Sequence, residues 1–122
     1  MSTAFTPILH QTLERTPGAL GAIFADADGE AVDHATRKLL ARDDLLVLGA
    51  HYGVLLGLVR SALERFHLGR VQEILFHHER LDVLIQDVGD GYYVVLAVES
   101  GSHLASARSG LSRCAAALKA EM

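Results

Sequence analysis

The chain has 122 residues, one cysteine and a formal net charge of -4; half of its residues are apolar and 21% are charged. This length and composition predict a single globular domain over residues 1–122 and exclude a disordered chain. The negative charge argues against a nucleic-acid-binding protein, which would need a basic patch. The one local basic cluster, Arg37, Lys38 and Arg42, is too small to bind a polyanion.

The single cysteine, Cys114, excludes an intrachain disulfide and fits a reducing cytoplasm. Because it lies among alanines, we expect a packed thiol and not a nucleophile. The N-terminus lacks the basic-then-apolar order of a signal peptide. The longest apolar run, residues 45–59, is shorter than the ~20 residues that a bilayer needs. We therefore expect a cytoplasmic protein without membrane insertion.

The N-terminal region predicts a helix. Thr6 is suited to the N-cap and Pro7 to the first turn, where its missing N–H costs nothing. The helix is expected to run to about Arg15, because residues 16–18 (TPG) interrupt it.

A hairpin is expected next. Two short apolar runs, residues 19–26 and 31–35, flank the dipeptide Asp28-Gly29. Such a dipeptide favours a tight turn because glycine supplies the positive φ. Residues 36–43 then form a charged connector.

Residues 44–67 predict one long helix, which Asp43 or Asp44 could cap and which Gly69 would follow as a C-terminal signal. Three strands are expected after it, over residues 71–78, 80–88 and 92–98. The second alternates, with one face formed by Leu81, Val83 and Ile85 and the other by Asp82 and Gln86.

The last strand, residues 92–98, is almost wholly apolar, which predicts a central strand covered on both faces. Asp90-Gly91 before it gives a second hairpin turn. A final helix over residues 103–119 follows, with Ser102 as its expected cap. The order α-β-β-α-β-β-β-α predicts an α+β fold: a five-stranded, mostly antiparallel sheet with the long helix on one face and the two terminal helices on the other.

Small residues recur every fourth position in the long helix, at Gly49, Gly53, Gly57 and Ser61. Each glycine costs a helix about 1 kcal/mol relative to alanine. Such a stripe lets another backbone approach, which suggests an offsetting contact with a second helix.

At 100° per residue, large apolar side chains gather on one broad arc of this helix, which we expect to lie on the sheet: Leu45, Leu48, Tyr52, Leu55, Leu56, Val59, Ala62, Leu63 and Phe66. The other arc carries the small-residue stripe together with exposed aliphatics. Exposed patches of this kind usually mark partner surfaces. We predict a dimer or partner interface formed by Val47, Gly49, Ala50, His51, Gly53, Val54, Gly57, Leu58, Ser61 and Arg65. The alternative is that another part of the same chain covers this arc.

Three local patterns then resemble the Roadblock/LC7 family (dynein light chain, LAMTOR and MglB-like). They are residues 18–29 (GALGAIFADADG), the small-residue-rich central helix that ends at Gly69, and residues 93–108 (YVVLAVESGSHLASAR). His103 and Ala105 stand where the family often has Asn and Gly. The resemblance extends from about residue 7 to 118.

This resemblance implies a homodimer in which the central helices of two subunits pair and the sheets join edge to edge. It also implies a role beside Ras-like small GTPases, as an activator or a scaffold. The residues to which a GTPase-binding role carries over are Val47, Ala50, His51, Val54, Leu58 and Arg65.

Other chemistry has weaker signals. His77 and His78 are adjacent on a predicted strand and so point to opposite faces, which disfavours a shared metal ion. No strand–Gly-rich loop–helix–Lys pattern is present, so we expect no nucleotide site and no cofactor. Arg60 or Arg65 could reach a partner GTPase as an arginine finger, but ordering of the partner's switch segments is the favoured route to activation.

Three hypotheses remain open from the sequence. The first is a homodimeric regulator or scaffold of a small GTPase that is not itself an enzyme. The second is a non-catalytic assembly module, and the third is a small-molecule sensor with a cavity between helix and sheet.

Overall fold

The computed structural model describes residues 2–37 and 41–122. The chain order is α1 (Thr6–Arg15), β1 (Ala19–Ala25), β2 (Ala31–Thr36), α2 (Arg42–Leu63), the 3₁₀ turn η1 (Glu64–Phe66), β3 (Glu73–His77), β4 (Leu81–Gly89), β5 (Tyr92–Glu99) and α3 (Leu104–Ala120). The predicted α+β fold and element order are confirmed. The centre of the predicted connector, including Lys38 of the basic cluster, lies outside the described residues.

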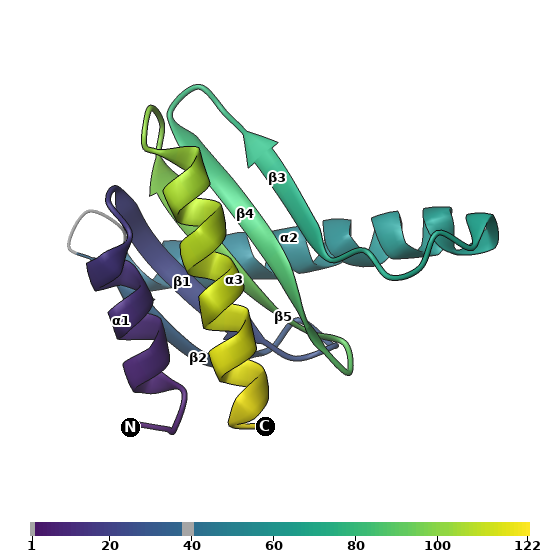
Figure 1. Ribbon diagram of the computed structural model, residues 1–122, viewed down its shortest axis with the longest axis horizontal. Helices are drawn as coiled ribbons and strands as arrows, with labels where there is room; N and C mark the ends of the chain where they lie inside the picture. The colour runs from purple at the N-terminus through teal and green to yellow at the C-terminus, as the bar shows by residue number, and fades with distance from the viewer. Residues whose placement is uncertain (1, 38–40) are drawn as a thin grey trace.

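The sheet has the order β2-β1-β5-β4-β3, and each neighbouring pair is antiparallel (Figure 1). β5 occupies the centre and is buried on both faces, as its continuous apolar sequence predicts. β2 and β3 are the two edge strands, so each leaves one side of its backbone without a strand partner in the sheet.

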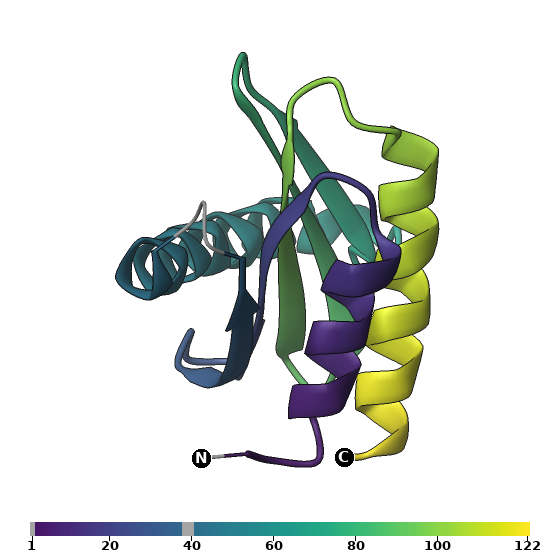
Figure 2. The same ribbon diagram turned by 90° about the vertical axis from the view of Figure 1, so that its left-hand side faces the viewer.

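Helices cover the two faces unequally. α1 and α3 lie together on one face, and α2 lies alone on the other (Figure 2). Successive residues of a strand point to opposite faces. Val94 and Leu96 therefore pack in the cluster beneath α1 and α3, whereas Tyr93 and Val95 pack in the cluster beneath α2. Leu81, Val83 and Ile85 of β4 lie in the cluster beneath α2, which confirms the prediction that they share one face of the strand.

Both predicted hairpin turns are present. Gly29 has a φ of 85°, and the main-chain N–H of Gly29 donates to the carbonyl of Asp26. At the second turn, Asp90 and Gly91 have φ values of 54° and 85°. Positive φ at both central residues is typical of the type I′ turn, whose twist matches that of the flanking strands.

The predicted capping residues are wrong. The N-cap positions of the three α-helices have no side-chain cap hydrogen bond; they are Phe5, Ala41 and His103. The hydroxyl of Thr6 donates to the Asp33 carboxylate and accepts from the main-chain N–H of Thr3, which precedes the helix. Asp43 and Asp44 lie too late in the chain to cap and occupy the first turn, where a carboxylate complements the helix dipole.

Ser102 is also displaced from its predicted role. It precedes the N-cap and lies against Gly18, where a Cβ atom on that glycine would fall 2.0 Å from the Ser102 hydroxyl oxygen. Contact between the two loops therefore determines the position of Ser102.

The long helix crosses the sheet and continues past β3 (Figure 1). By length and composition alone, the helical segment Arg42–Phe66 could also cross a membrane, and only 17% of its most apolar window is buried. Core helices of soluble proteins meet the same criterion. Here α2 packs on the sheet through the buried Leu45, Gly49 and Leu56 and the half-buried Leu46, Leu48 and Tyr52, while Val47, Val54 and Leu58 are exposed.

Candidate protein-interaction surface

The glycine stripe does not lie on one side of α2. Gly49 faces the sheet, where a Cβ atom would fall 2.8 Å from Cγ2 of Ile23. Gly53 also contacts the sheet, because its Cβ would fall 2.0 Å from the Tyr93 hydroxyl. Gly57 has nothing within 4 Å of that position. The prediction that the whole stripe faces away from the sheet is therefore wrong at Gly49 and Gly53.

The reason lies in helix geometry. A step of four residues turns about 400° at ~100° per residue, so each successive member of the stripe is displaced by about 40°. Gly49 thus lies on the side of α2 that faces the sheet, Gly53 at the margin of that side, and Gly57 and Ser61 in exposed positions. The first two glycines allow close packing within one chain, and only the last two small residues remain open to a partner.

The predicted sheet-facing arc is correct from Leu45 to Val59 except at Leu55, and wrong beyond it. Leu45 and Leu56 are buried, and Leu48, Tyr52 and Val59 are half-buried. The other members of the arc are exposed: Leu55, which precedes the buried Leu56, and Ala62, Leu63 and Phe66, where the helix has passed the sheet edge. At ~1.5 Å per residue, 22 helical residues extend about 33 Å, whereas five strands ~4.8 Å apart span about 19 Å.

A ridge of exposed aliphatic side chains follows the outer face of α2. Val47, Val54 and Leu58 are 56%, 65% and 61% exposed. The exposed residues beside them are Ala50, His51, Gly57, Ser61 and Arg65. We call these eight residues the α2 ridge. Its members at positions 47, 50, 54, 57 and 61 follow the alternating three- and four-residue spacing by which two helices pair along a seam.

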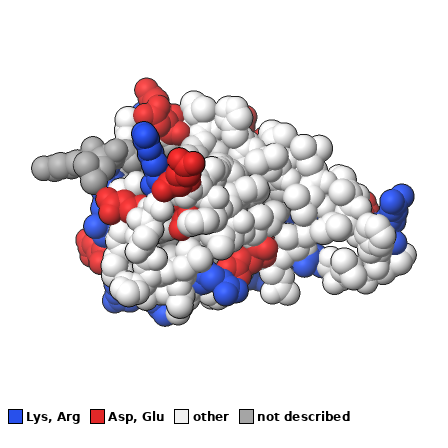
Figure 3. All heavy atoms as spheres, turned by 90° about the horizontal axis from the view of Figure 1, so that it is seen from above, with Lys and Arg blue, Asp and Glu red and all other residues white. Residues whose placement is uncertain are grey.

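A second apolar region lies where α2 projects past the sheet. Phe66 is 54% exposed and Leu68 is 73% exposed. In Figure 3 this end is mostly uncharged, with basic side chains at its tip. Sequence reasoning missed Leu68, and also Leu75 on the edge strand β3, which is 39% exposed. The predicted helix is longer than a five-stranded sheet is wide, and this mismatch could have indicated that one end of the helix projects past the sheet.

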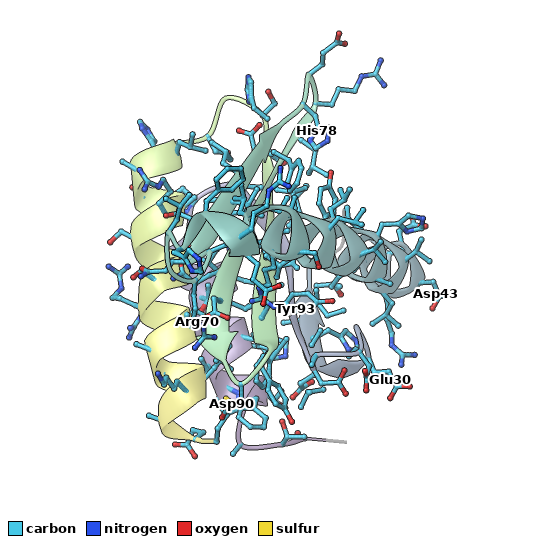
Figure 4. All side chains as sticks on the ribbon, turned by 90° about the vertical axis from the view of Figure 1, so that its right-hand side faces the viewer. Glu30, Asp43, Arg70, His78, Asp90 and Tyr93 are labelled. Atoms are coloured by element: carbon cyan, nitrogen blue, oxygen red, sulfur yellow. The ribbon has the colours of Figure 1, made fainter. Side chains whose placement is uncertain are left out.

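A cleft of about 780 Å³ opens beneath the projecting end, between α2 and the β4–β5 turn. Arg70 and Asp90, which both line it, are labelled in Figure 4. The other lining residues are Arg60, Ser61, Leu63, Glu64, His67, Gly69, Val71 and Gly91. Both charge signs are present, so the cleft has no preference for one ionic ligand.

Polar contacts also hold α2 on the sheet. Asp87 of β4 accepts hydrogen bonds from Arg60 at 2.8 Å and from Arg70 at 2.7 Å, and its side chain is 12% exposed. In the middle of α2, the Tyr52 hydroxyl lies 2.9 Å from Nε2 of His78 (labelled in Figure 4). The Arg60 guanidinium is thus held on the sheet by its ion pair with Asp87. The Arg65 guanidinium is exposed and lies 5.2 Å from the centroid of the Phe66 ring.

The adjacent histidines have different partners. His77 contacts the buried Asp82 carboxylate, while Nδ1 of His78 donates to the carbonyl of Leu81 at 2.9 Å. Within residues 2–37 and 41–122, the structure has no group of three or more His, Cys, Asp or Glu side chains placed to hold a metal ion. Cys114 is buried in the core, and burial raises the pKa of its thiol above the usual 9.0.

Comparison with solved structures identifies the fold. MglB with a tetrameric arrangement matches with a TM-score of 0.86 at 21% identity, covering 98% of this chain and 91% of that one. The gliding protein MglB from Thermus thermophilus matches with a TM-score of 0.86 at 20% identity, covering 98% and 92%. MglC from Myxococcus xanthus matches with a TM-score of 0.70 at 27% identity, covering 98% and 100%.

No curated protein sequence matches the chain. The family model of the Roadblock/LC7 domain matches residues 7–98, from the second residue of α1 to the last but one of β5. This match covers most of the chain and agrees with the fold of the solved structures. The chain therefore belongs to the Roadblock/LC7 domain family.

Proposed function

We propose that the chain forms a homodimer that regulates or scaffolds a Ras-like small GTPase, without a nucleotide site, cofactor or catalytic centre of its own, in the cytoplasm. The observation that carries this proposal is the α2 ridge, with its three large aliphatic side chains in water. Burying one such side chain contributes roughly 1.5–3 kcal/mol, which favours association. Membership of the Roadblock/LC7 family supports both parts of the proposal.

The shape of α2 supports association with a second copy. Its end projects past the edge strand β3 with Phe66 and Leu68 exposed, and a sheet placed beside β3 would lie under it. β3 also offers an edge whose backbone groups another strand can bond. Because Gly57 has no side chain and Ser61 a small one, a second copy of α2 can approach closely on this side. A structure of MglB has a tetrameric arrangement, which is consistent with association between copies.

The GTPase would bind the part of the α2 ridge that the twin helix leaves open. Leu58 would provide apolar contact there, with His51 and Arg65 at its polar margin, whereas Val47 and Val54 would lie in the seam with the twin helix. Arg60 is held by Asp87, so of the two arginines considered as a finger only Arg65 is free to reach a partner. Ordering of the GTPase switch segments remains the route that we propose for any stimulation of hydrolysis.

The test uses the Ras-like GTPases of the same organism, beginning with any product of a neighbouring gene, loaded with GDP or a non-hydrolysable GTP analogue. We expect binding that depends on the nucleotide and that Leu58→Asp weakens at least tenfold. The matched control is Ser112→Asp, which adds the same charge on exposed α3. Absence of binding in both nucleotide states would contradict the GTPase proposal and leave the dimer as an assembly module.

Turnover distinguishes regulator from scaffold. If the wild-type chain accelerates GTP hydrolysis and Arg65→Ala does not, Arg65 acts as a finger; acceleration retained by Arg65→Ala supports switch ordering. Tight binding without acceleration supports a scaffold.

The small-molecule sensor hypothesis has less support, because it needs a cavity beside the glycines. Ile23 and Tyr93 fill the space beside Gly49 and Gly53.

A further inference from the structure

The two edge strands, β2 and β3, lie at opposite ends of the sheet (Figure 1) and differ in whether their outward main-chain groups are free. In an antiparallel ladder, opposite residues alternate between pairs that exchange main-chain hydrogen bonds and pairs that do not. The main-chain N–H of Asp87 donates to the carbonyl of Gln72, and that of His78 donates to the carbonyl of Leu81. Even-numbered residues of β3 therefore bond to β4, and the main-chain groups that point outward belong to Glu73, Leu75 and His77.

The edge of β3 is open. Its two ionisable side chains bond to other elements of the domain: Nε of Arg108 on α3 donates to Glu73 at 2.6 Å, and His77 contacts the buried Asp82 of β4. Leu75, between them, is 39% exposed. Within residues 2–37 and 41–122, no hydrogen bond is made by the outward main-chain groups of these three β3 residues. Such an edge can add a strand from another chain.

The edge of β2 is closed at its centre. The main-chain N–H of Arg37 donates to the carbonyl of Leu20, so the odd-numbered residues from 33 to 37 bond to β1 and the main chain of His34 points outward. The His34 N–H donates to Oδ1 of the preceding residue, Asp33, at 2.8 Å. The donor that an added strand would need at this position is therefore already bound to a carboxylate.

The segment before α1 holds this carboxylate at the edge. Oδ2 of Asp33 accepts hydrogen bonds from the hydroxyls of Thr3 at 2.6 Å and Thr6 at 2.5 Å. The main-chain N–H of Thr3 in turn donates to Oγ1 of Thr6 at 2.8 Å, which fixes the two threonines relative to each other. Burial raises the pKa of Asp33, but its hydrogen bonds outweigh this effect and keep the group charged at neutral pH. One carboxylate thus joins residues 3–6 to the free side of β2.

A second charge lies on the other face of β2. Successive residues of a strand point to opposite faces, so Asp33 lies on the face of α1 and His34 on the face of α2. Nε of Arg42, at the start of α2, donates to Nε2 of His34 at 3.2 Å. A strand that paired with β2 would have to remove water from both charged groups, which costs free energy. Charged side chains are a common means of protecting a sheet edge.

From these contacts we propose that residues 3–6, which we call the N-terminal strap, act through Asp33 as an autoinhibitory contact that prevents β2 from pairing with β2 of a second copy. Copies with one open edge form a closed pair, whereas copies with two open edges pair twice and assemble without limit. Release of the N-terminal strap from Asp33 would therefore change closed association into open-ended assembly.

The sequence of β2 suits pairing with itself once the carboxylate is removed. An antiparallel pair centred on His34 would place Val32 of one copy opposite Thr36 of the other, and both are β-branched residues that favour strands. It would also place Asp33 of one copy opposite Ala35 of the other. The carboxylate is thus the group in this pairing that opposes burial.

The test compares oligomeric mass by light scattering after size-exclusion chromatography, at ~100–500 µM protein. We expect Asp33→Ala to form assemblies with a mass at least about twofold above that of the wild type and growing with concentration. Thr3→Val combined with Thr6→Val keeps the carboxylate but removes the hydrogen bonds of the N-terminal strap, so its mass should also rise. Glu14→Ala, which removes a carboxylate from the exposed side of α1, is the matched control and should have the mass of the wild type.

Proline at position 34 identifies the strand that pairs. Because the His34 N–H points away from β1, adding His34→Pro to Asp33→Ala removes only the outward donor and should return the mass to that of the wild type. Nonspecific aggregation would persist in this double variant. A folded Asp33→Ala with the mass of the wild type, or an assembly that His34→Pro does not reverse, would overturn the proposal. If Asp33→Ala does not fold, an unchanged mass in the double threonine variant overturns it.

This test is separate from that of the proposed function. Each variant is compared with the wild type, whatever the mass of the wild type is. A monomeric wild type would contradict the homodimer proposed above, but only the excess mass of the variants reports on the β2 edge.

Discussion

The phenolic hydroxyl of Tyr93 donates a hydrogen bond to the main-chain carbonyl of Gly49, 3.3 Å away, and so joins the central strand to the long helix. The same ring fills the space beside Gly53, one turn further along α2. Burial raises the pKa of Tyr93 above 10.0, and the nearby Asp26 adds to this effect. Tyr93 of β5 therefore accounts for the glycine at position 53, as Ile23 of β1 does for Gly49.

Substitution of two glycines of the stripe should have opposite effects. Gly53→Ala should destabilise the domain by roughly 1–3 kcal/mol, because the added methyl overlaps the Tyr93 ring. Gly57→Ala meets no atom of its own chain and should stabilise the isolated domain by about 1 kcal/mol. Urea unfolding at low protein concentration measures both. Equal losses in the two variants would mean that Gly57 is also packed within the chain.

Removal of the Tyr93 hydroxyl should reveal the coupling directly. Tyr93→Phe should cost about 0.5–1.5 kcal/mol, the usual net contribution of one hydrogen bond. In the double variant with Gly53→Ala the total loss should be smaller than the sum, because the atom closest to the new methyl is absent. A strictly additive double-mutant cycle would refute the proposed contact.

The attachment of the second half of α2 should depend on Asp87. Asp87→Asn leaves Arg60 and Arg70 without their shared carboxylate and should destabilise the domain by roughly 1–3 kcal/mol. Hydrogen exchange should increase most in α2 after Leu56 and much less in its first half. Glu64→Gln, on exposed η1, is the control and should leave exchange unchanged.

Two carboxylates predict acid sensitivity. Burial raises the pKa of Asp33, but hydrogen bonds from Thr3, Thr6 and the main chain of His34 outweigh it and hold the pKa below 3.8. The Arg108 hydrogen bond and charge lower the pKa of Glu73 below 4.5, against the opposing effect of burial. The native state thus binds fewer protons than the unfolded chain as the pH falls towards these values.

The stability that these two groups contribute is therefore fully present above the unfolded values of 3.8 and 4.5, and is lost as the pH falls through the lower native values. Unfolding free energies at pH 7 and pH 3 should differ less in Arg108→Met than in the wild type, because Glu73 then titrates normally. An unchanged pH dependence in that variant would exclude the Glu73 contribution.

The sequence predicted the element order and the faces of the strands because both follow from local patterns. Alternation along β4, the unbroken apolar run of β5 and the Asp-Gly turns each depend on neighbours within a few residues. The capping predictions for Thr6 and Ser102 were wrong because these residues contact Asp33 and Gly18, which are distant in the sequence. No local pattern contains those contacts.

The interaction surface was predicted in part for a similar reason. Helical periodicity placed Val47, Val54 and Leu58 on the exposed face, where the structure has them. It failed at Gly49 and Gly53, because only the sheet reveals that Ile23 and Tyr93 require the space. Whether the α2 ridge binds a partner remains a prediction.

The mass of the protein in solution tests the central proposal, that a second copy covers the exposed side of α2. Light scattering after size-exclusion chromatography should give twice the 13.1 kDa chain mass for the wild type and for the control Ser112→Glu on α3. Val54→Glu should shift towards the monomer mass while remaining folded, because it places a charge in the seam. A wild type that stays at 13.1 kDa at ~100 µM would contradict the dimer.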